Sequence, residues 1–349
     1  MEFIVNDESK NADLTNQKSR YSWTGETELL TKSPTAKTSN RPKITIVTPS
    51  YNQGKFIEKT ILSVVQQGYP NLEYIVIDGG SNDNTLEIIN KYQDYLDYWV
   101  SEPDRGQAHA INKGLEQATG DIIAFLNSDD LYLPETLSFV ANFFTEHPEI
   151  DFICGQTEFI NQKSQPTSGF ADLFKVEIND MTMTETCHIA QPSTFFRASA
   201  YQKNGNFNES LHYCFDYDFW LRAYLNGAKF ATTNQTLSQF RIHDNSKTNT
   251  AYTEGKFDRD FIQIYQTTLA TTTITNAQKK GLRNGLAIAT ALLFIHLESS
   301  NSLPIARFQL WQIIRQTPEI FLSKSIWRTL LVSLLPNFAR QTWQQWKQL

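Results

Sequence analysis

The sequence has few cysteines and no long apolar run. Its 349 residues include three cysteines, Cys154, Cys187 and Cys214, which lie far apart. This odd number and wide spacing fit neither a disulfide framework nor a zinc site, and they favour a reducing compartment. No window of about 20 residues is free of charged and polar groups, so we expect no membrane-spanning helix. The first residues lack the basic start and apolar stretch of a secretory signal, so the expected location is the cytoplasm.

Two common nucleotide-binding motifs are also missing. No Gly-x-Gly-x-x-Gly follows the first predicted strand, which disfavours a dinucleotide-binding Rossmann domain. No Gly-x-x-x-x-Gly-Lys-Ser/Thr occurs, which disfavours a Walker-type nucleotidase. The net charge of −6 argues against strong nonspecific binding of nucleic acid, which we therefore do not expect as a partner.

The chain divides into three regions by composition. Residues 1–42 are rich in polar residues without a sustained period, which predicts a disordered N-terminal tail. Residues 43–250 alternate short apolar runs with helical periodicity, which predicts an α/β fold with a mostly parallel sheet. Residues 251–349 are predicted to be a helical C-terminal region. The predicted strands are 44–48, 72–78, 98–101, 121–126, 150–154 and 237–242, and the predicted helices are 55–67, 84–95, 106–118, 134–146, 216–226, 277–298 and 303–315, with 161–190 irregular.

Acidic side chains follow the strand predicted at 121–126. This apolar strand ends in Asn127-Ser128-Asp129-Asp130, at the edge where open α/β sheets bind ligands. Carboxylates fixed at such an edge repel each other unless a cation joins them, and a divalent cation carrying a diphosphate would do so. The same residues also suit a turn or a helix cap, so both interpretations stay open at this point.

Other strand ends deliver small and polar residues to the same edge. The first predicted strand runs into Pro49-Ser-Tyr51-Asn52-Gln-Gly54, and the second into Asp78-Gly-Gly80-Ser81-Asn-Asp83. A third segment, Ser101–Gly114, places Asp104, Arg105 and Gln107 before a helix N-terminus, which is a natural anion site. Ordinary turns would explain each segment alone, but three converging strand ends indicate a ligand site.

Taken in order, these motifs resemble those of the family 2 glycosyltransferases, which have the nucleotide-sugar-binding GT-A fold. The resemblance spans residues 43–245 and is carried by Thr48-Pro-Ser-Tyr-Asn52, Ile77-Asp-Gly-Gly-Ser-Asn-Asp83, Asp104-Arg-Gly-Gln107, Asn112-Lys-Gly114, Gly120–Asp130 and Phe215-Asp-Tyr-Asp-Phe-Trp-Leu-Arg222. It implies a Rossmann-like, mostly parallel sheet with a helical C-terminal extension. It also implies inverting transfer of a sugar from a nucleotide-sugar, expected to be a UDP-sugar, to a glycan or lipid-linked acceptor in cell-envelope or exopolysaccharide assembly.

The resemblance also assigns the donor site and its cofactor, a divalent cation (Mg²⁺ or Mn²⁺). The family usually has Asp-x-Asp where this chain has Asn127-Ser128-Asp129, so the metal is placed mainly on Asp129, and His243 is a candidate further ligand. The implied donor-binding residues are Pro49, Tyr51, Asn52, Asp78, Gly80, Ser81, Asp104, Arg105, Gln107, Asn112, Asn127, Ser128 and Arg241.

The catalytic base is implied to be Asp216, which would deprotonate the acceptor hydroxyl. The family carries an acidic pair here, and Phe215 replaces the first acid. Asp218 lies two residues further on and is the alternative base, or else an acid that caps the helix. The predicted acceptor side comprises Gln191, Pro192 and Ser193, which precede these acids in the chain, and Trp220, which follows them.

Two alternatives concern function and location. Because Asn127 and Phe215 depart from the family pattern, a catalytically degenerate donor-binding scaffold subunit is the alternative function. Residues 324–349 combine four basic residues and no acids with Trp and Leu, which is typical of an interfacial helix and predicts peripheral association with the inner face of the cell membrane. A terminal helix docked on the fold would show the same pattern.

Overall fold

The computed structural model describes residues 41–167, 177–244, 246–247, 255–270, 273–299, 303–318, 320 and 326–327. The chain divides into two compact units, Met1–Ile178 with His188–His243, and Asn179–Cys187 with Asp244–Leu349. The predicted tail lies outside the described residues, apart from its last two.

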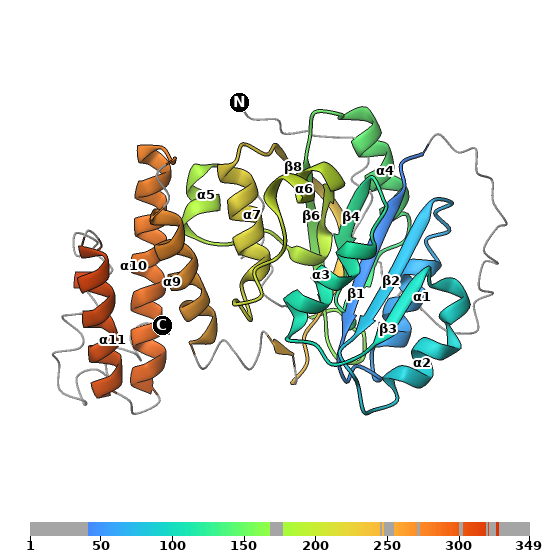
Figure 1. Ribbon diagram of the computed structural model, residues 1–349, viewed down its shortest axis with the longest axis horizontal. Helices are drawn as coiled ribbons and strands as arrows, with labels where there is room; N and C mark the ends of the chain where they lie inside the picture. Colours follow the sequence, from blue (N-terminus) through green and yellow to red (C-terminus); the bar gives the residue numbers. More distant parts are fainter. Residues whose placement is uncertain are drawn as a thin grey trace. The chain divides into compact units, whose positions relative to one another are not determined.

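The first unit is built around one eight-stranded sheet (Figure 1). Its order is β3-β2-β1-β4-β7-β6-β8-β5. Strands β1, β2, β3 and β4 are mutually parallel neighbours, β7 is antiparallel to both β4 and β6, and β6 is parallel to β8. The predicted mostly parallel α/β sheet is therefore confirmed. The strands are β1 (Ile44–Ser50), β2 (Leu72–Asp78), β3 (Tyr98–Ser101), β4 (Ile122–Phe125), β5 (Leu131–Tyr132), β6 (Phe152–Ile160), β7 (Thr194–Arg197) and β8 (Phe230–Arg241).

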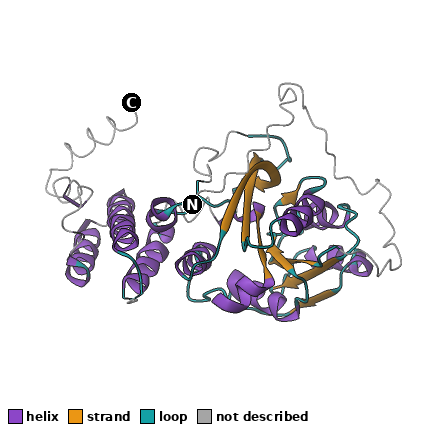
Figure 2. Ribbon diagram, turned by 90° about the horizontal axis from the view of Figure 1, so that it is seen from above, coloured by secondary structure: helices purple, strands orange, loops and turns teal. Residues whose placement is uncertain are grey.

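Helices cover both faces of this sheet (Figure 2). Ile44, Ile46 and Val76 point to a core shared with α1, α2 and α4. Val47 and Ile77 point to the other face, where Gly114 of α3 lies so close that an added Cβ would clash with Val47. The helices of this unit are α1 (Ile57–Val65), α2 (Thr85–Lys91), α3 (Gln107–Gln117), α4 (Thr136–Glu146), α6 (Ala198–Asn204) and α7 (Phe215–Leu225), with 3₁₀ turns at Gln93–Tyr95 and Gln191–Ser193.

Some elements differ from the sequence-based expectation. The strand predicted at 150–154 runs on to Ile160, and the strand predicted at 237–242 begins at Phe230. Their extensions are half-exposed and rich in Thr, Gln and Asn, so they lack the apolar run that marks a buried strand. The short elements β5, β7 and α6, which span two, four and seven residues, were not predicted.

The second unit contains α5 (Asp180–Glu185), α9 (Lys256–Leu269), α10 (Asn276–Ser299) and α11 (Leu303–Gln316). The segment 161–190 was predicted to be irregular, but Asn179 and Thr182 form a capping box that starts α5. Gly281 and Gly285 of α10 let Thr184 and the Tyr265 ring approach the helix backbone closely. The predicted helical character of this region is confirmed for its described part.

Two predictions concern the membrane, and the described residues cover them only in part. Within the described residues, no helix is both long and apolar enough to cross a bilayer. The predicted interfacial segment 324–349 lies outside the described residues except for Ile326 and Trp327.

Candidate active site

The carboxyl end of β2 is organised by Asp78. Its side chain is fully buried and accepts hydrogen bonds from the backbone N–H groups of Gly80 (3.1 Å) and Ser81 (2.8 Å). The hydroxyls of Ser81 (2.5 Å) and Ser101 (2.6 Å) donate to the same carboxylate. Four donors of this kind hold the carboxylate in place and fix the loop around it, with Gly80 at a φ of 82°.

The loop after β1 is tied to the loop after β2. The backbone N–H of Asn52 donates to Ser81 Oγ (2.7 Å), and Asn52 Oδ1 accepts from the backbone N–H of Asn82 (2.9 Å). Asn52 has a φ of 52°, which Asn tolerates better than most residues. Pro49 is buried in β1, whereas the Tyr51 side chain is 59% exposed. The predicted donor residues on these two loops therefore lie together, with an aromatic ring open to a ligand.

The segment before α3 continues this edge. Asp104 accepts from the backbone N–H of Gly106 (2.7 Å), and its carboxylate lies against Gly79, where a Cβ would come within 2.5 Å of Oδ2. Gln107, the first residue of α3, donates from Nε2 to Asn127 Oδ1 (2.6 Å). The loops after β1, β2, β3 and β4 are thus connected by contacts, each of which includes at least one predicted donor residue.

Asn127 links the predicted donor and acceptor sides. Its Nδ2 donates to Gln191 Oε1 (3.1 Å) and to Asp130 Oδ2 (3.3 Å), while Gln191 Nε2 donates to the Phe125 carbonyl (2.7 Å). An aspartate could not donate to either acceptor and would add a negative charge beside buried Asp130. The departure from Asp-x-Asp therefore suits the surroundings of this side chain.

Asp129 and Asp130 have different environments although they are neighbours. Asp129 is partly exposed, and its Oδ2 lies 3.0 Å from Nε2 of His243. Asp130 is almost completely buried and accepts from the backbone N–H of Arg241 (2.9 Å). Burial, and secondly the charge of Asp129, raise the pKa of Asp130 well above its usual range. Asp129 is therefore the more accessible of the two acids, and Ser128 between Asn127 and Asp129 is buried.

The Asp129–His243 pair fits two neighbouring ligands of one divalent ion. Octahedral ligands at about 2.1 Å from an ion lie about 3 Å from each other, which is close to the observed separation. Within the described residues, no group of three or more His, Cys, Asp and Glu side chains could hold a metal. The remaining ligands would then come from water or from the donor diphosphate.

Arg241 is buried beneath this pair. Its guanidinium donates from Nε to the Asp129 carbonyl (2.8 Å) and from Nη1 to the carbonyl of Asn161 (3.0 Å) and the hydroxyl of Ser164 (2.9 Å). It also lies over the Phe56 ring, 5.1 Å from the centroid. Burial lowers the pKa of Arg241, with the nearby carboxylates acting in the opposite direction. Nη2 is buried and has no hydrogen-bond partner among the described residues.

The two candidate bases lie in the first turn of α7. Asp216 is partly exposed, and its Oδ1 accepts from the backbone N–H of Tyr217 (2.7 Å). Asp218 is buried and paired with Arg222 (2.8 Å); burial raises its pKa, and Arg222 counters that effect. Phe215 packs against the ring of Phe125, at 6.1 Å between centroids. Asp216 is therefore the more accessible acid, and Phe215 is part of the core.

Three of the predicted acceptor-side residues are buried. Trp220 is completely buried, and its ring packs against those of Phe152 and Phe196, each at 5.7 Å between centroids. Ser193 is also buried and shares hydrogen bonds with Ser238 (2.6 Å), and Pro192 precedes it in the same buried turn. These three residues therefore belong to the core beneath this region, whereas Gln191 is partly exposed and hydrogen-bonded to Asn127 and the Phe125 carbonyl.

Hydrogen bonds that were not predicted from the sequence join the region of α3 to the loop before α7. Asn112 grips the backbone of Phe207, accepting from its N–H and donating to its carbonyl, both at 2.9 Å. Glu209 accepts from Arg105 (3.0 and 2.6 Å) and from Asn112 (3.1 Å). Burial opposes ionisation of Glu209, but Arg105 and Asn112 outweigh it and lower its pKa. We refer to Arg105, Asn112, Phe207 and Glu209 as the α3 clasp; Glu209 lies in a polar loop that carries no motif.

Known proteins match both the sequence and the fold. A model of the family described as Glycosyl transferase family 2 matches residues 45–205. The chain is 32% identical over 222 residues to an uncharacterized glycosyltransferase of Rickettsia typhi, covering 60% of this chain and 67% of that protein. It is 29% identical over 197 residues to the poly(ribitol-phosphate) beta-N-acetylglucosaminyltransferase TarS of Staphylococcus aureus, covering 54% of this chain and 34% of TarS.

Solved structures share the architecture at low sequence identity. A crystal structure of S. aureus TarS in complex with UDP-GlcNAc has a TM-score of 0.62 at 23% identity and covers 79% of this chain and 82% of that chain. The mannosyltransferase PcManGT from Pyrobaculum calidifontis, in complex with GDP-Man and Mn²⁺, has a TM-score of 0.58 at 18% identity and covers 85% and 88%. Together with the sheet and its loops, these matches show that the chain is a glycosyltransferase and belongs to glycosyl transferase family 2.

Proposed function

We propose that this glycosyltransferase moves a sugar from a nucleotide-sugar to a glycan or lipid-linked acceptor by a single displacement that inverts the anomeric carbon. The observation that carries the proposal is the meeting of Asp129 and His243, 114 residues apart in the chain, at 3.0 Å beside the connected loops of β1, β2 and β4. A partly exposed carboxylate beside a buried imidazole at this distance is the kind of ligand pair that could bind Mn²⁺ or Mg²⁺.

The donor would lie along the loops that the structure connects. Tyr51, Asn52 and Asp78 would contact or position the nucleoside, and Asp129 with His243 would hold the ion and its diphosphate. The ion, when bound, would offset the charge that develops on the leaving diphosphate. A UDP-sugar is the first choice because the TarS structure contains UDP-GlcNAc, and a GDP-sugar is the second because the Pyrobaculum structure contains GDP-Man.

The acceptor would be activated by Asp216. This residue is the second of α7, where the helix dipole favours a negatively charged side chain. A sugar hydroxyl is a weak acid, so the carboxylate would take its proton as the oxygen attacks the anomeric carbon. The poly(ribitol-phosphate) acceptor named for TarS supports a cell-envelope glycan as the acceptor class. We propose a cytoplasmic enzyme with peripheral association at the inner face of the membrane, where lipid-linked acceptors lie.

The first experiment is thermal unfolding with UDP, GDP, dTDP and CDP, each with and without Mn²⁺. A nucleotide at 100 times its dissociation constant adds about 2.7 kcal/mol of stability. This corresponds to a rise in Tm of about 5–10 °C. A rise with one nucleotide that requires Mn²⁺ supports the donor site and selects the sugars to test for turnover. No rise with any of them contradicts the proposed donor site.

A second candidate function is a donor-binding scaffold subunit, which the neutral Asn127 and the apolar Phe215 favour. Turnover with the selected donor separates the two candidates. Asp216→Asn should abolish transfer and keep the nucleotide-dependent rise in Tm, whereas Asp218→Asn should keep transfer. If wild type binds the nucleotide but transfers no sugar from any donor, the scaffold is the better conclusion.

A further inference from the structure

Helix α11 has two sets of apolar residues, one buried and one exposed. Ala306, Leu310 and Ile313 are buried, whereas three other apolar residues are more than half exposed: Ile305 (54%), Phe308 (56%) and Trp311 (56%). Their spacing of three residues places the exposed side chains on the side of the helix opposite the buried ones. We refer to Ile305, Phe308 and Trp311 as the α11 stripe.

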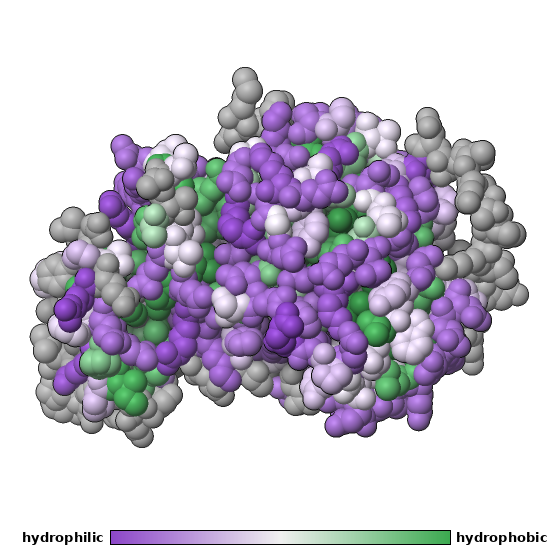
Figure 3. All heavy atoms as spheres, in the orientation of Figure 1, coloured by the Kyte–Doolittle hydropathy of each residue, from purple (hydrophilic) through white to green (hydrophobic). Residues whose placement is uncertain are grey.

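Exposed apolar side chains are concentrated in the second unit. Seven of the nine large hydrophobic residues that are exposed in the described part of the chain belong to it: Met181, Ile288, Leu292, Ile305, Phe308, Trp311 and Trp327. Hydrophobic surface is visible over α10 and α11 in the space-filling view (Figure 3). A single exposed apolar residue such as Met181 needs no explanation, but three of them on one side of α11 indicate an interaction surface.

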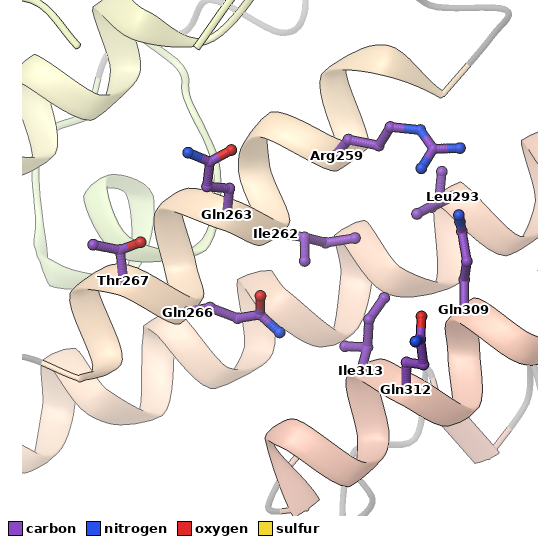
Figure 4. A pocket seen from close by; sticks show the side chains of 9 residues that line it. All are labelled: Arg259, Ile262, Gln263, Gln266, Thr267, Leu293, Gln309, Gln312 and Ile313. Carbon is purple, nitrogen blue, oxygen red and sulfur yellow. The ribbon is translucent and has the colours of Figure 1, made fainter. Parts of the chain in front are cut away.

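Helix α11 also borders a groove that it shares with α9 and α10. This groove of about 390 Å³ lies between α9, α10 and α11, and Arg259, Gln309 and Gln312 are among the residues that line it (Figure 4). Most of its lining residues are polar, and α11 contributes Gln309, Gln312 and Ile313 but none of the stripe residues. The α11 stripe is therefore not needed for packing against the described helices.

Charge indicates what the stripe contacts. Residues 273–349 contain nine Lys and Arg residues and two Glu, although the whole chain has a net charge of −6. In α11 itself there are two arginines and no acid, and the Arg315 guanidinium lies over the exposed Trp311 ring, 5.4 Å from its centroid. Two copies of so basic a region would repel each other, whereas an anionic lipid surface attracts basic residues and accepts exposed aromatic rings.

We propose that the α11 stripe docks on the surface of an anionic lipid bilayer. Ile305, Phe308 and Trp311 enter the boundary between headgroups and acyl chains, and the basic residues of α10 and α11 supply the attraction. The proposal deepens the peripheral association in the proposed function by naming a contact surface on α11. Vesicle binding requires neither donor nor acceptor, so it fails or succeeds separately from sugar transfer.

Co-sedimentation of the full chain with vesicles tests the proposal. Vesicles of phosphatidylcholine with phosphatidylglycerol should bind the wild type, pure phosphatidylcholine should bind it weakly, and added salt should weaken binding. The Phe308→Ser/Trp311→Ser double variant should lose about tenfold or more of the partitioning, because two large apolar groups no longer leave water. Met181→Ser is the matched control, since it removes a 61% exposed apolar side chain of the same unit; it should bind like wild type.

Three results would overturn the proposal. The first is unchanged vesicle binding by the double variant with an unchanged Tm. The second is loss of binding in Trp343→Ser/Trp346→Ser but not in the α11 variant, which would place the contact in the C-terminal segment. The third is a wild-type dimer that the α11 substitutions convert to a monomer in the absence of lipid, which would make the stripe an interface between copies.

Discussion

Two carboxylates lie at the same edge of the sheet, and they differ in burial and in the number of hydrogen bonds they accept. Asp78, at the end of β2, is fully buried and accepts four hydrogen bonds from its own and neighbouring loops. Asp129, after β4, is partly exposed, and its carboxylate contact is with His243. A carboxylate whose oxygens already accept hydrogen bonds from the protein fixes a loop. A carboxylate whose oxygens can accept further bonds can take a ligand.

The comparison explains why both acids belong to one site. Asp78 fixes the loops that carry Tyr51 and Asn52. It would therefore affect a ligand indirectly, through the positions of those loops. Asp129 would meet the ligand directly. Substitutions at the two positions should therefore separate folding from activity.

The largest expected effect comes from Asp129→Asn. Removing the charge that faces the ion should reduce transfer by about 10³-fold, since metal stabilisation of a leaving group is worth several kcal/mol. The free energy of unfolding should change by less than about 1 kcal/mol, because few internal bonds are lost. Turnover and thermal unfolding measure the two quantities, with the exposed acid of Asp94→Asn as the control. Retained turnover would remove Asp129 from the proposed site.

The reverse pattern is expected for Asp78→Asn. The two hydrogens of the new amide would face groups that are themselves hydrogen-bond donors, so some of these bonds would be lost. The variant should therefore lose about 2–3 kcal/mol of stability. Its Tm should fall by about 5–10 °C, and any loss of activity at low temperature should be smaller than that of Asp129→Asn. A variant with wild-type Tm and no nucleotide binding would show instead that Asp78 contacts the donor directly.

The α3 clasp gives the next test. Asn112→Ala leaves the buried N–H and carbonyl of Phe207 without partners, which should cost about 2 kcal/mol. Because Phe207 precedes α7, turnover should fall while the nucleotide-dependent rise in Tm remains. Gln117→Ala, at an exposed position of the same helix, is the control and should behave like wild type. Equal losses of nucleotide binding and turnover would favour direct donor contact by Asn112.

The smallest expected effect is on stability and concerns Glu73, near the other end of β2. Like Asp78, it has a carboxylate that accepts several hydrogen bonds from the protein. Burial opposes its ionisation, but hydrogen bonds from Lys43, Thr119 and Thr45 outweigh burial and lower its pKa to about 2. The stability that it contributes is present above pH 4.5, the ordinary value, and is lost as the pH falls toward 2. Glu73→Gln should be less stable by about 1–2 kcal/mol at pH 7, and the difference should shrink on acidification in unfolding measurements. A difference that does not depend on pH would contradict this account.

How far the sequence could predict the molecule depends on the element. β1, β2 and β4 were predicted because they are buried apolar runs, and their strand ends were recognised by their polar residues. β5 and β7 are too short to show a period, and the polar stretches of β6 and β8 conceal their extent. In the site, Asp129 and His243 were chosen from a family resemblance, and the structure brings them together. Glu209 was missed because its bond to Asn112 joins residues 97 apart in the chain, and neither belongs to a shared local pattern.

The order in which the site is completed follows from the distance in sequence between its two halves. His243 lies 114 positions after Asp129 in the chain, and β5 pairs with β8, which ends at Arg241. At the usual rate of translation, about 5–20 residues per second, His243 is added roughly 6–20 s after Asp129. The strands that carry the donor loops can pair on the ribosome during that interval, whereas the ligand pair can close only afterwards. A nascent chain stalled before residue 243 should therefore be partly folded and unable to hold the ion through both side chains.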